Sequence, residues 1–509
     1  TGWAPKVSRA PPIPSKTVHD IRQLLRATYQ DRKDFLKKVG RRMAREPLEG
    51  DKWIRITMLG GYREVGRSAT LLSTQESKVL IDCGLAMGGE DNLIPYLKAP
   101  ELSPLQNLDA IVVTHAHLDH SGLVPALFKY GYDGPVYVTA PTRDMMSLLQ
   151  VDAIKVSYGE AKKALYDSSH VREQVKHTIC LDYGETTDIA PDIRLTLHNA
   201  GHILGSSIAH FHIGDGLYNI AITGDIKYER TWLFNPTQHK FPRLEAVVME
   251  STYGGFHDLQ PSRNDAGKQL EDTMKRVLER GGKMIVPVFA VGRSQEVMLA
   301  MENLVRTAKL PDVKIYLDGM IWEATAIHTA YPEFLNHRLR NKVYLKQENP
   351  FLSEIFQRVD SMETREKIIN SVDPCVVLAT SGMMNGGPVM EYFKNWASDE
   401  KNAIVFVGYQ AEGTFGKRLQ RGMDKAVIND RGKTFSIEVN LEVQTADGFS
   451  GHSDRLQLVR YVSRLQPRPK RIILCHGEES KTQDLASSIY KKYNIETRAP
   501  MNLETIRLA

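Results

Sequence analysis

The sequence predicts an α/β fold in which two packed β-sheets, covered by helices, are interrupted by a separate parallel α/β domain. Three observations support this prediction. The chain has 509 residues, which is too long for one ordinary hydrophobic core. Short strand patterns separated by glycine turns dominate the region after residue 53. Between about residues 256 and 432, helical and strand patterns alternate instead, as they do around a parallel sheet.

The first 48 residues are predicted to form a basic segment made of a linker and helices. Residues 1–16 contain four prolines, which is typical of a linker. Apolar residues then recur at helical spacing from Thr17 to Met43. Residues 1–45 hold 12 Lys and Arg but only 3 Asp, whereas the whole chain has a net charge of +5. This segment is either an arm that binds a polyanion or the solvated face of a helix.

The first domain is expected at residues 49–255 and again at 433–509, with residues 256–432 inserted between its two parts. Several of its expected strands alternate and several are apolar throughout, which favours two packed sheets. These strands are residues 53–59, 69–73, 78–82, 110–114, 135–139, 193–198, 208–213, 218–223, 246–250, 435–446 and 472–475. In the insert, helices at 270–279 and 294–306 alternate with strands at 284–290, 313–317, 375–380 and 403–408.

The most informative stretch is His115-Ala116-His117-Leu118-Asp119-His120, which follows an apolar run at residues 109–113. One divalent cation could take His115 and His117, and a second could take Asp119 and His120. Nitrogen and oxygen ligands without thiolates favour a catalytic zinc pair over a structural zinc. The alternative is a polar loop whose histidines are incidental.

Further candidate ligands and catalytic groups stand at the ends of other predicted strands. Loops on a rigid scaffold commonly present such groups, and so many at strand ends favour one shared site. They are Asp82, His202, Asp225, Glu250 and His476, together with His452 in the loop 448–454.

These residues, together with two short motifs, resemble the β-CASP nucleases of the metallo-β-lactamase superfamily. The motifs are Met-Glu-Ser-Thr-Tyr-Gly at 249–254 and Ser-Gly-His-Ser-Asp at 450–454, and the stretches 287–296 and 379–384 of the insert also fit. Within that group, the chain resembles archaeal homologues of the cleavage and polyadenylation specificity factor nuclease. The resemblance implies a metallo-β-lactamase αββα sandwich with an inserted β-CASP domain. RNA-binding KH domains precede the nuclease in that group, so residues 1–48 would be what remains of the junction.

The resemblance also implies two Zn²⁺ ions and assigns their ligands. The first ion would take His115, His117, His202 and Asp225, and the second Asp119, His120, Asp225 and His476. Asp82 would lie behind the ligands and hold a ligand histidine or the attacking water. A hydroxide generated between the zinc ions would attack the phosphorus, and His452, oriented by Glu250, would protonate the leaving 3′-oxygen.

The implied function is hydrolysis of RNA phosphodiester bonds with 5′-phosphate and 3′-hydroxyl products. Endonuclease and 5′→3′ exonuclease use both remain open. Arg293, Ser381 and Ser450 are candidate phosphate contacts in a cleft between the domains, or else ordinary turn and helix-capping residues. The resemblance further implies a role in RNA 3′-end processing and transcription termination in archaea, a homodimer, and RNA polymerase or the elongation machinery as a partner.

Composition indicates where such a protein works. The four cysteines form no C-x-x-C pair, which favours free thiols in a reducing cytoplasm. No apolar run approaches the roughly 18 residues that span a membrane.

Four competing interpretations follow from the same superfamily. A small-molecule hydrolase needs no insert of this size, and a flavodiiron oxidoreductase would carry glutamate at the place of His117. DNA-directed relatives usually carry an apolar residue where this chain has His476, which favours RNA. The fourth alternative is a catalytically silent RNA-binding or termination factor.

Overall fold

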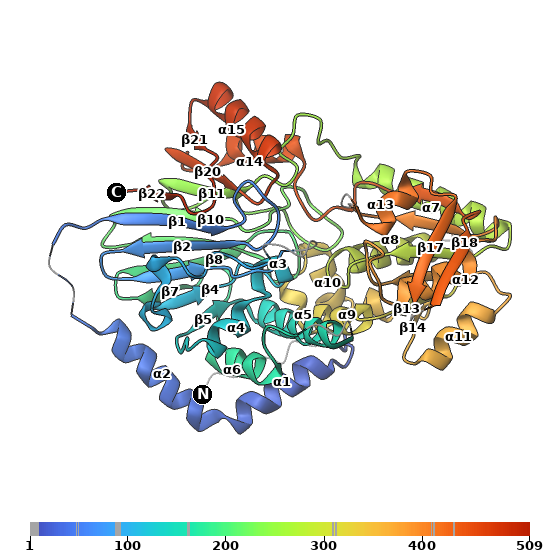
Figure 1. Cartoon of the computed structure of the whole chain (residues 1–509), viewed down its shortest axis with the longest axis horizontal. Helices are drawn as coiled ribbons and strands as arrows, with labels where there is room; N and C mark the ends of the chain where they lie inside the picture. Colours follow the sequence, from blue (N-terminus) through green and yellow to red (C-terminus); the bar gives the residue numbers. More distant parts are fainter. Residues whose placement is uncertain are drawn as a thin grey trace. The chain divides into compact units, whose positions relative to one another are not determined.

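The computed structural model describes residues 10–46, 48, 50–86, 93–159, 163–307, 310, 313–408, 410, 413–430 and 433–509. The chain divides into two compact units (Figure 1). The sandwich unit comprises Lys16–Arg230, Phe234–Leu259 and His452–Ala509, and the insert unit comprises Thr1–Ser15, Thr231–Leu233 and Gln260–Gly451. Residues 1–9 of the predicted linker and the predicted boundary at residue 432 lie outside the described residues.

The first sheet of the sandwich unit has seven strands in the described chain, in the order β22-β1-β2-β3-β4-β5-β6. Its pairs are antiparallel from β22 to β3 and parallel from β3 to β6. The strands are β1 (Ile54–Gly60), β2 (Ala69–Thr74), β3 (Lys78–Ile81), β4 (Ala110–Val112), β5 (Val136–Val138), β6 (Thr178–Cys180) and β22 (Thr505–Arg507).

The second sheet also has seven described strands, in the order β21-β20-β11-β10-β9-β8-β7. Its pairs are parallel from β21 to β10 and antiparallel from β10 to β7. The strands are β7 (Thr186–Ala190), β8 (Ile193–Asn199), β9 (Ser207–Ile213), β10 (Tyr218–Ile222), β11 (Ala246–Glu250), β20 (Arg471–Cys475) and β21 (Glu496–Arg498).

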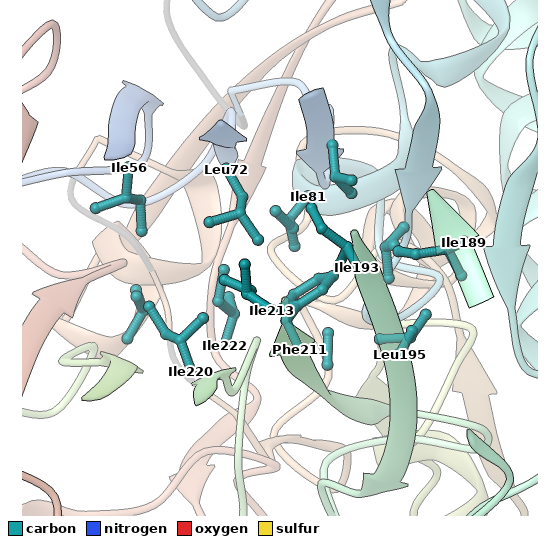
Figure 2. Close-up of a cluster of buried hydrophobic side chains, with 14 of the residues drawn as sticks. Ile56, Leu72, Ile81, Ile189, Ile193, Leu195, Phe211, Ile213, Ile220 and Ile222 are labelled. Carbon is teal, nitrogen blue, oxygen red and sulfur yellow. The ribbon is translucent and has the colours of Figure 1, made fainter. Parts of the chain in front are cut away.

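The two sheets pack face to face over one apolar core (Figure 2). Ile56 and Leu72 of the first sheet and Leu195, Phe211 and Ile220 of the second belong to this core and are fully buried. Burial of each such side chain contributes about 1.5–3 kcal/mol. The core therefore fixes the two sheets against each other, and with them the loops at their strand ends.

Helices cover the outer faces of the sandwich, which confirms the predicted order of layers. Leu458 of α14 and Leu485 of α15 pack on Val247 and Leu474 of the second sheet. Helix α5 lies beside β6 of the first sheet and contacts α6. The helices are α3 (Leu118–Ser121), α4 (Val124–Lys129), α5 (Ala140–Gly159), α6 (Ser168–His177), α14 (Arg455–Arg464) and α15 (Glu479–Tyr493), with short 3₁₀ turns at Pro100–Leu102 and Leu105–Asn107.

The helical pattern predicted between Thr17 and Met43 is two helices, α1 (Lys16–Ala27) and α2 (Tyr29–Met43). Thr28 separates them, with φ −104° and ψ 24°. Helix α1 contacts α5 and α6, and α2 contacts α6 and β7. The basic segment thus packs on the sandwich unit through its apolar stripe.

The insert unit is built around a parallel sheet of six described strands, in the order β14-β13-β15-β12-β16-β19, as the alternating pattern predicts. The strands are β12 (Met284–Pro287), β13 (Ile315–Asp318), β14 (Phe356–Arg358), β15 (Val376–Ala379), β16 (Ala403–Phe406) and β19 (Glu442–Thr445), and β17 (Lys425–Asp430) and β18 (Lys433–Glu438) form a separate hairpin. Its helices are α7 (Arg263–Glu279), α8 (Arg293–Arg306), α9 (Ile321–Ala330), α10 (His337–Leu345), α11 (Met362–Asn370), α12 (Pro388–Trp396) and α13 (Phe415–Gln420), with 3₁₀ turns at Pro332–Phe334 and Pro350–Leu352.

The insert unit extends further along the chain than the sequence boundary at 432. The predicted strand at 435–446 is split into β18 and β19, and β19 pairs with β16 at the edge of the insert sheet. Leu441 and Ala446 flank β19 and are buried. An isolated strand pattern does not reveal which sheet it joins, so this assignment required the structure.

Two predictions from composition can be compared with the structure. All four cysteines are free, and Cys83 and Cys375 are buried. Among the described helices, none combines the length and the apolar character needed to cross a membrane.

Candidate metal centre

The loop after β4 carries four of the predicted metal ligands. His115 follows the strand directly after Thr114, and His117 caps the short helix α3 that contains Asp119 and His120. The backbone carbonyl of His117 accepts hydrogen bonds from the amides of His120 and Ser121, at 3.0 and 2.8 Å. This tight turn brings four side chains from a stretch of six residues, 115–120, to the same place.

Backbone contacts from the loop after β3 hold α3 in position. The amide of Cys83 donates to the His120 carbonyl, and the amide of Leu85 donates to the Leu118 carbonyl, both at 2.8 Å. Between them, a Cβ on Gly84 would lie 1.7 Å from the Asp119 carbonyl oxygen. Only glycine permits this approach, so Gly84 is required for the two loops to pack.

The remaining predicted ligands come from the second sheet. His202 follows β8, Asp225 follows β10 and His476 follows β20. The backbone of His476 has a positive φ of 47°, as does that of Asp82 after β3, at 58°. Such conformations cost a non-glycine residue of order 1–3 kcal/mol and are typically retained where function requires them.

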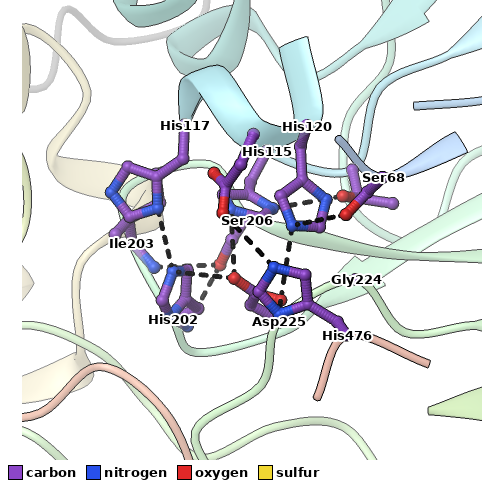
Figure 3. Close-up of polar contacts among 12 residues, drawn as sticks. Ser68, His115, His117, His120, His202, Ile203, Ser206, Gly224, Asp225 and His476 are labelled. Atoms are coloured by element: carbon purple, nitrogen blue, oxygen red, sulfur yellow. Dashed lines mark hydrogen bonds and ion pairs between the residues drawn. The ribbon is translucent and has the colours of Figure 1, made fainter. Parts of the chain in front are cut away.

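The first group of side chains surrounds one carboxylate oxygen of Asp225 (Figure 3). Asp225 Oδ2 lies 3.5 Å from His115 Nε2 and 3.6 Å from His202 Nε2. His202 Nε2 in turn lies 3.1 Å from His117 Nδ1. All four residues offer ligand atoms within 4.8 Å of one another, as the predicted first metal ion would require.

The second group surrounds the other oxygen of the same carboxylate. Asp225 Oδ1 lies 3.4 Å from His120 Nε2 and 3.2 Å from His476 Nδ1. Asp119 Oδ2 lies on the far side of the His476 ring, 3.3 Å from Nε2. Within 4.8 Å, Asp119 groups with His115 and His120, and Asp225 groups with His120 and His476. Asp225 therefore faces both groups, one with each oxygen.

The donor atoms of this cluster fit metal ions. His115 Nε2 and Asp225 Oδ1 are buried and make no hydrogen bond in the described chain. Two imidazole nitrogens, those of His117 and His202, face each other at 3.1 Å. Buried polar atoms without hydrogen-bond partners are rare in proteins, and a cation bound by several of them removes the cost of burying them.

The protonation preferences of the first group suit metal ligands. Burial lowers the pKa of His117 to about 4 and the pKa of His115 well below its usual value. Burial alone would raise the pKa of Asp225, but the neighbouring His476 and His120 hold it well below the usual value. Neutral imidazoles and an ionised carboxylate are the forms that bind zinc.

Asp82 lies behind His120. Its Oδ2 lies 2.7 Å from His120 Nδ1 and accepts a hydrogen bond from the Thr114 hydroxyl at 2.8 Å, and its Oδ1 accepts from the Thr114 amide at 2.7 Å. A proton on Nδ1 directed at Asp82 leaves the Nε2 lone pair of His120 facing Asp225. Of the two roles expected for Asp82, the geometry supports the one that orients a histidine.

A second carboxylate–histidine pair stands beside the first group. Glu250 Oε2 lies 3.0 Å from His452 Nδ1, and its Oε1 accepts a hydrogen bond from the Ile226 amide at 2.6 Å. The His452 ring lies 4.6 Å from the His202 ring, centroid to centroid. Glu250 is fully buried, whereas the His452 side chain retains 14% of its exposure. A buried carboxylate thus fixes an imidazole that solvent can reach.

Three family models match consecutive parts of the chain. The metallo-beta-lactamase superfamily model matches residues 62–277 and the Beta-Casp domain model matches residues 294–419. A model described as a Zn-dependent metallo-hydrolase RNA specificity domain matches residues 436–500.

Curated relatives match along the whole chain. The transcription termination factor FttA of Methanosarcina mazei is 59% identical, over 100% of this chain and 80% of the relative. The chain belongs to the FttA family of β-CASP metallo-β-lactamase proteins. FttA proteins of Methanothermobacter thermautotrophicus and Lokiarchaeum sp. are 53% and 47% identical, each over 100% of this chain and 80% of the relative. The family and fold are those of a zinc-dependent metallo-hydrolase.

One solved structure shows the same fold at low sequence identity. A protein of unknown function from Enterococcus faecalis V583 superposes with a TM-score of 0.55 and is 14% identical. The match covers 90% of this chain and 100% of the other. It supports the sandwich with an insert as the architecture of this FttA family member.

The three predicted phosphate contacts all belong to the insert unit. Arg293 is the first residue of α8, with its guanidinium 5.3 Å from the centre of the Phe289 ring. The Ser381 hydroxyl donates to the Gly386 carbonyl at 3.1 Å, and the Ser450 carbonyl accepts from Arg263 Nη2 at 3.1 Å. Ser381 thus makes the turn contact that the alternative interpretation expects, and a role in binding phosphate remains a prediction.

Sequence reasoning missed three hydroxyl residues that shape this centre. Ser206 Oγ accepts from the amides of His202 and Ile203, at 3.1 and 3.2 Å. Thr252 Oγ1 lies 3.1 Å from His476 Nδ1, and Ser68 Oγ lies 3.4 Å from His120 Nε2. A hydroxyl in a loop carries no pattern by itself, although Thr252 stands two residues after Glu250 within the motif at 249–254.

Proposed function

We propose that this chain is a zinc-dependent ribonuclease that cleaves RNA in 3′-end formation and transcription termination. Relatives named transcription termination factors and a family model for an RNA specificity domain support the proposal. The observation that carries it is the Glu250–His452 pair, which stands next to a cluster that fits metal ions. A metal centre alone would suit many hydrolyses, whereas an added, fixed imidazole suits protonation of a leaving group.

The proposed centre holds two zinc ions. Asp225 would be the shared ligand, because each of its oxygens faces one group of histidines. The first ion would be held by His115, His117, His202 and Asp225, and the second by Asp119, His120, Asp225 and His476. When bound, the ions would lower the pKa of water toward about 7 and neutralise charge on the phosphoryl oxygens.

The residues of the chain supply the remaining steps. Asp82 holds His120 with its Nε2 directed inward, and Glu250 accepts the Nδ1 proton of His452. The Nε2 atom of His452 is then the one that delivers a proton to the departing ribose 3′-oxygen. Because water attacks rather than the 2′-hydroxyl, the upstream product ends in a 3′-hydroxyl and the downstream product begins with a 5′-phosphate.

The proposed substrate is single-stranded RNA, with Arg293, Ser381 and Ser450 as phosphate contacts. A homodimer and contact with RNA polymerase or the elongation machinery complete the proposal. A role in transcription termination implies the archaeal cytoplasm as the proposed location, and the four free cysteines suit that reducing compartment.

One alternative is a factor that terminates transcription without cleaving RNA, because the names of the relatives describe termination only. Zinc content and cleavage of a labelled single-stranded RNA separate the two functions. A zinc-loaded chain that binds this RNA without cutting it would favour the silent factor. Single-stranded DNA of the same sequence tests the DNA-directed alternative, and RNAs with a blocked or monophosphorylated 5′ end separate endonuclease from 5′→3′ exonuclease products.

A further inference from the structure

Lys227 is a buried lysine that takes no part in the proposed metal binding or proton transfer. Its side chain is 1% exposed. Lysine is almost never fully buried without partners, because removing an amine head group from water is costly. The contacts of the Lys227 amine therefore indicate why this side chain is buried.

The Lys227 side chain reaches the backbone of the residue proposed as the general acid. Its Nζ donates a hydrogen bond to the His452 carbonyl at 2.8 Å and lies 3.6 Å from Glu229 Oε2. The Lys227 backbone is held at both ends, since its amide donates to the Ala200 carbonyl and its carbonyl accepts from the Thr237 amide. The amine thus extends from a fixed segment to the loop that carries His452.

The neighbours of Lys227 hold the same loop. The Ser453 amide and hydroxyl both donate to the Ile226 carbonyl, at 2.8 and 3.0 Å, and the Tyr228 amide donates to the Ser453 hydroxyl at 2.8 Å. The Ile226 amide donates to Glu250. The segment 226–228, directly after Asp225, therefore contacts Glu250, His452 and Ser453, the residue that follows His452.

The loop before His452 contains glycines, so its backbone needs contacts that hold it in one conformation. Gly448 and Gly451 precede it in the same loop, and Gly448 has a φ of 115°. Glycine leaves the backbone more freedom than any other residue. A proton donor must lie within hydrogen-bond reach of its acceptor, and small misplacements reduce the rate strongly.

We propose that Lys227 is a positioning residue that fixes the backbone of His452, so that its imidazole lies where the leaving oxygen needs a proton. The proposal rests on the proposed role of His452. It predicts that loss of the Lys227 amine affects the proton-transfer step while leaving the metal ligands and RNA affinity in place.

The test compares Lys227→Met with His452→Ala in the whole zinc-loaded chain, on a single-stranded RNA cut at one defined bond. For Lys227→Met we expect unchanged zinc content, a KM within about threefold of wild type, and a kcat reduced about 10- to 100-fold, less than full loss of a general acid. The double variant should be no slower than His452→Ala alone, because both changes disable one step.

A second substrate separates positioning from general damage. A 3′-thio linkage at the cut bond releases a thiolate, which departs without protonation. Both variants should regain most of the wild-type rate on it. Lys283→Met is the matched control: Lys283 is also buried and donates to carbonyls, those of Ile369 and Ser371, but in the insert unit. We expect this control to lose stability and keep kcat.

The outcomes distinguish the two proposals. If His452→Ala cleaves the ordinary RNA at the wild-type rate, or is not rescued by the 3′-thio linkage, the general-acid role of His452 is overturned. If His452→Ala behaves as expected but Lys227→Met keeps the wild-type kcat, loses zinc, or is not rescued, the positioning role of Lys227 is overturned.

Discussion

Asp82 Oδ2 and His120 Nδ1 lie 2.7 Å apart in the buried interior of the sandwich unit. Burial alone would lower the pKa of His120, but the carboxylates of Asp225 and Asp82 raise it well above the usual value. The short contact assigns the Nδ1 proton to Asp82, and the opposite nitrogen, Nε2, faces Asp225. In the proposed centre, this contact determines that His120 would bind the metal through Nε2.

Changing Asp82 to Asn should weaken zinc binding without unfolding the chain. The amide cannot replace the charge that orients His120, and loss of such partners typically costs 10- to 100-fold in metal affinity. Zinc retained after dialysis against graded chelator measures the effect. Asp318→Asn is the control, because Asp318 is equally buried and is bonded to Arg365 and Tyr392 in the insert unit. Equal zinc retention in both variants would contradict the orienting role.

Changing Asp119 or His120 to Ala should remove one zinc ion and abolish cleavage while RNA binding is largely kept. His120 faces Asp225 Oδ1 and Asp119 faces the His476 ring, whereas the group of His115, His117, His202 and Asp225 contains neither residue. The zinc content measured by metal analysis should therefore fall from two ions to one per chain. Cleavage at the wild-type rate in either variant would show that the metal assignment is wrong.

Changing His452 to Ala should slow cleavage by about 10²- to 10⁴-fold and leave both zinc ions bound. Its Nδ1 lies 3.0 Å from Glu250 Oε2 but 3.9 Å from Asp225 Oδ2, which favours a proton donor over a ligand. Rate and zinc content measured on the same preparation test this. Because Asp225, Glu250 and His452 also lie close enough to share an ion, loss of zinc would make His452 a ligand instead.

Removing zinc with a chelator should abolish cleavage and leave the fold intact. The two sheets pack over an apolar core of residues such as Ile56 and Phe211, so we expect this packing to persist without metal. Ligand binding stabilises a fold by about 4 kcal/mol when the free ligand is 1,000-fold above its Kd. The melting temperature should fall while far-ultraviolet circular dichroism is retained, and added zinc should restore both stability and cleavage. Loss of the dichroism signal on chelation would mean that folding needs the metal.

The fold class was predictable because its signals are local. Alternating residues such as Leu195 and Leu197 face the core, whereas Thr196 between them does not belong to it, which is the period-two pattern of a half-buried strand. The proximity of the site residues was predictable for a related reason. Asp82, Asp225 and His476 each follow a buried apolar strand, and the structure brings all three to the same cluster.

The parts that could not be predicted depend on contacts distant in the sequence. Strand β19 has no pattern that distinguishes the sheet of the insert from that of the sandwich. Lys227 lies two residues after Asp225 in the chain, yet the role proposed for it rests on a hydrogen bond to a carbonyl 225 residues away. The break between α1 and α2 at Thr28 was also missed, because the apolar stripe continues across it.

Acid should destabilise the insert unit through His328. Burial lowers the pKa of this residue to about 4, below the value of about 6.5 expected in the unfolded chain. Because the folded state disfavours the protonated ring, its contribution is fully present above pH 6.5 and is lost as the pH falls toward 4. Between pH 6.5 and pH 5 the loss should be about 1.5 kcal/mol. Denaturant unfolding across this range should therefore be less pH-dependent in His328→Gln than in wild type.

His257→Gln, which changes an exposed histidine, is the control and should keep the wild-type dependence. An unchanged slope in His328→Gln would show that another group governs the acid response.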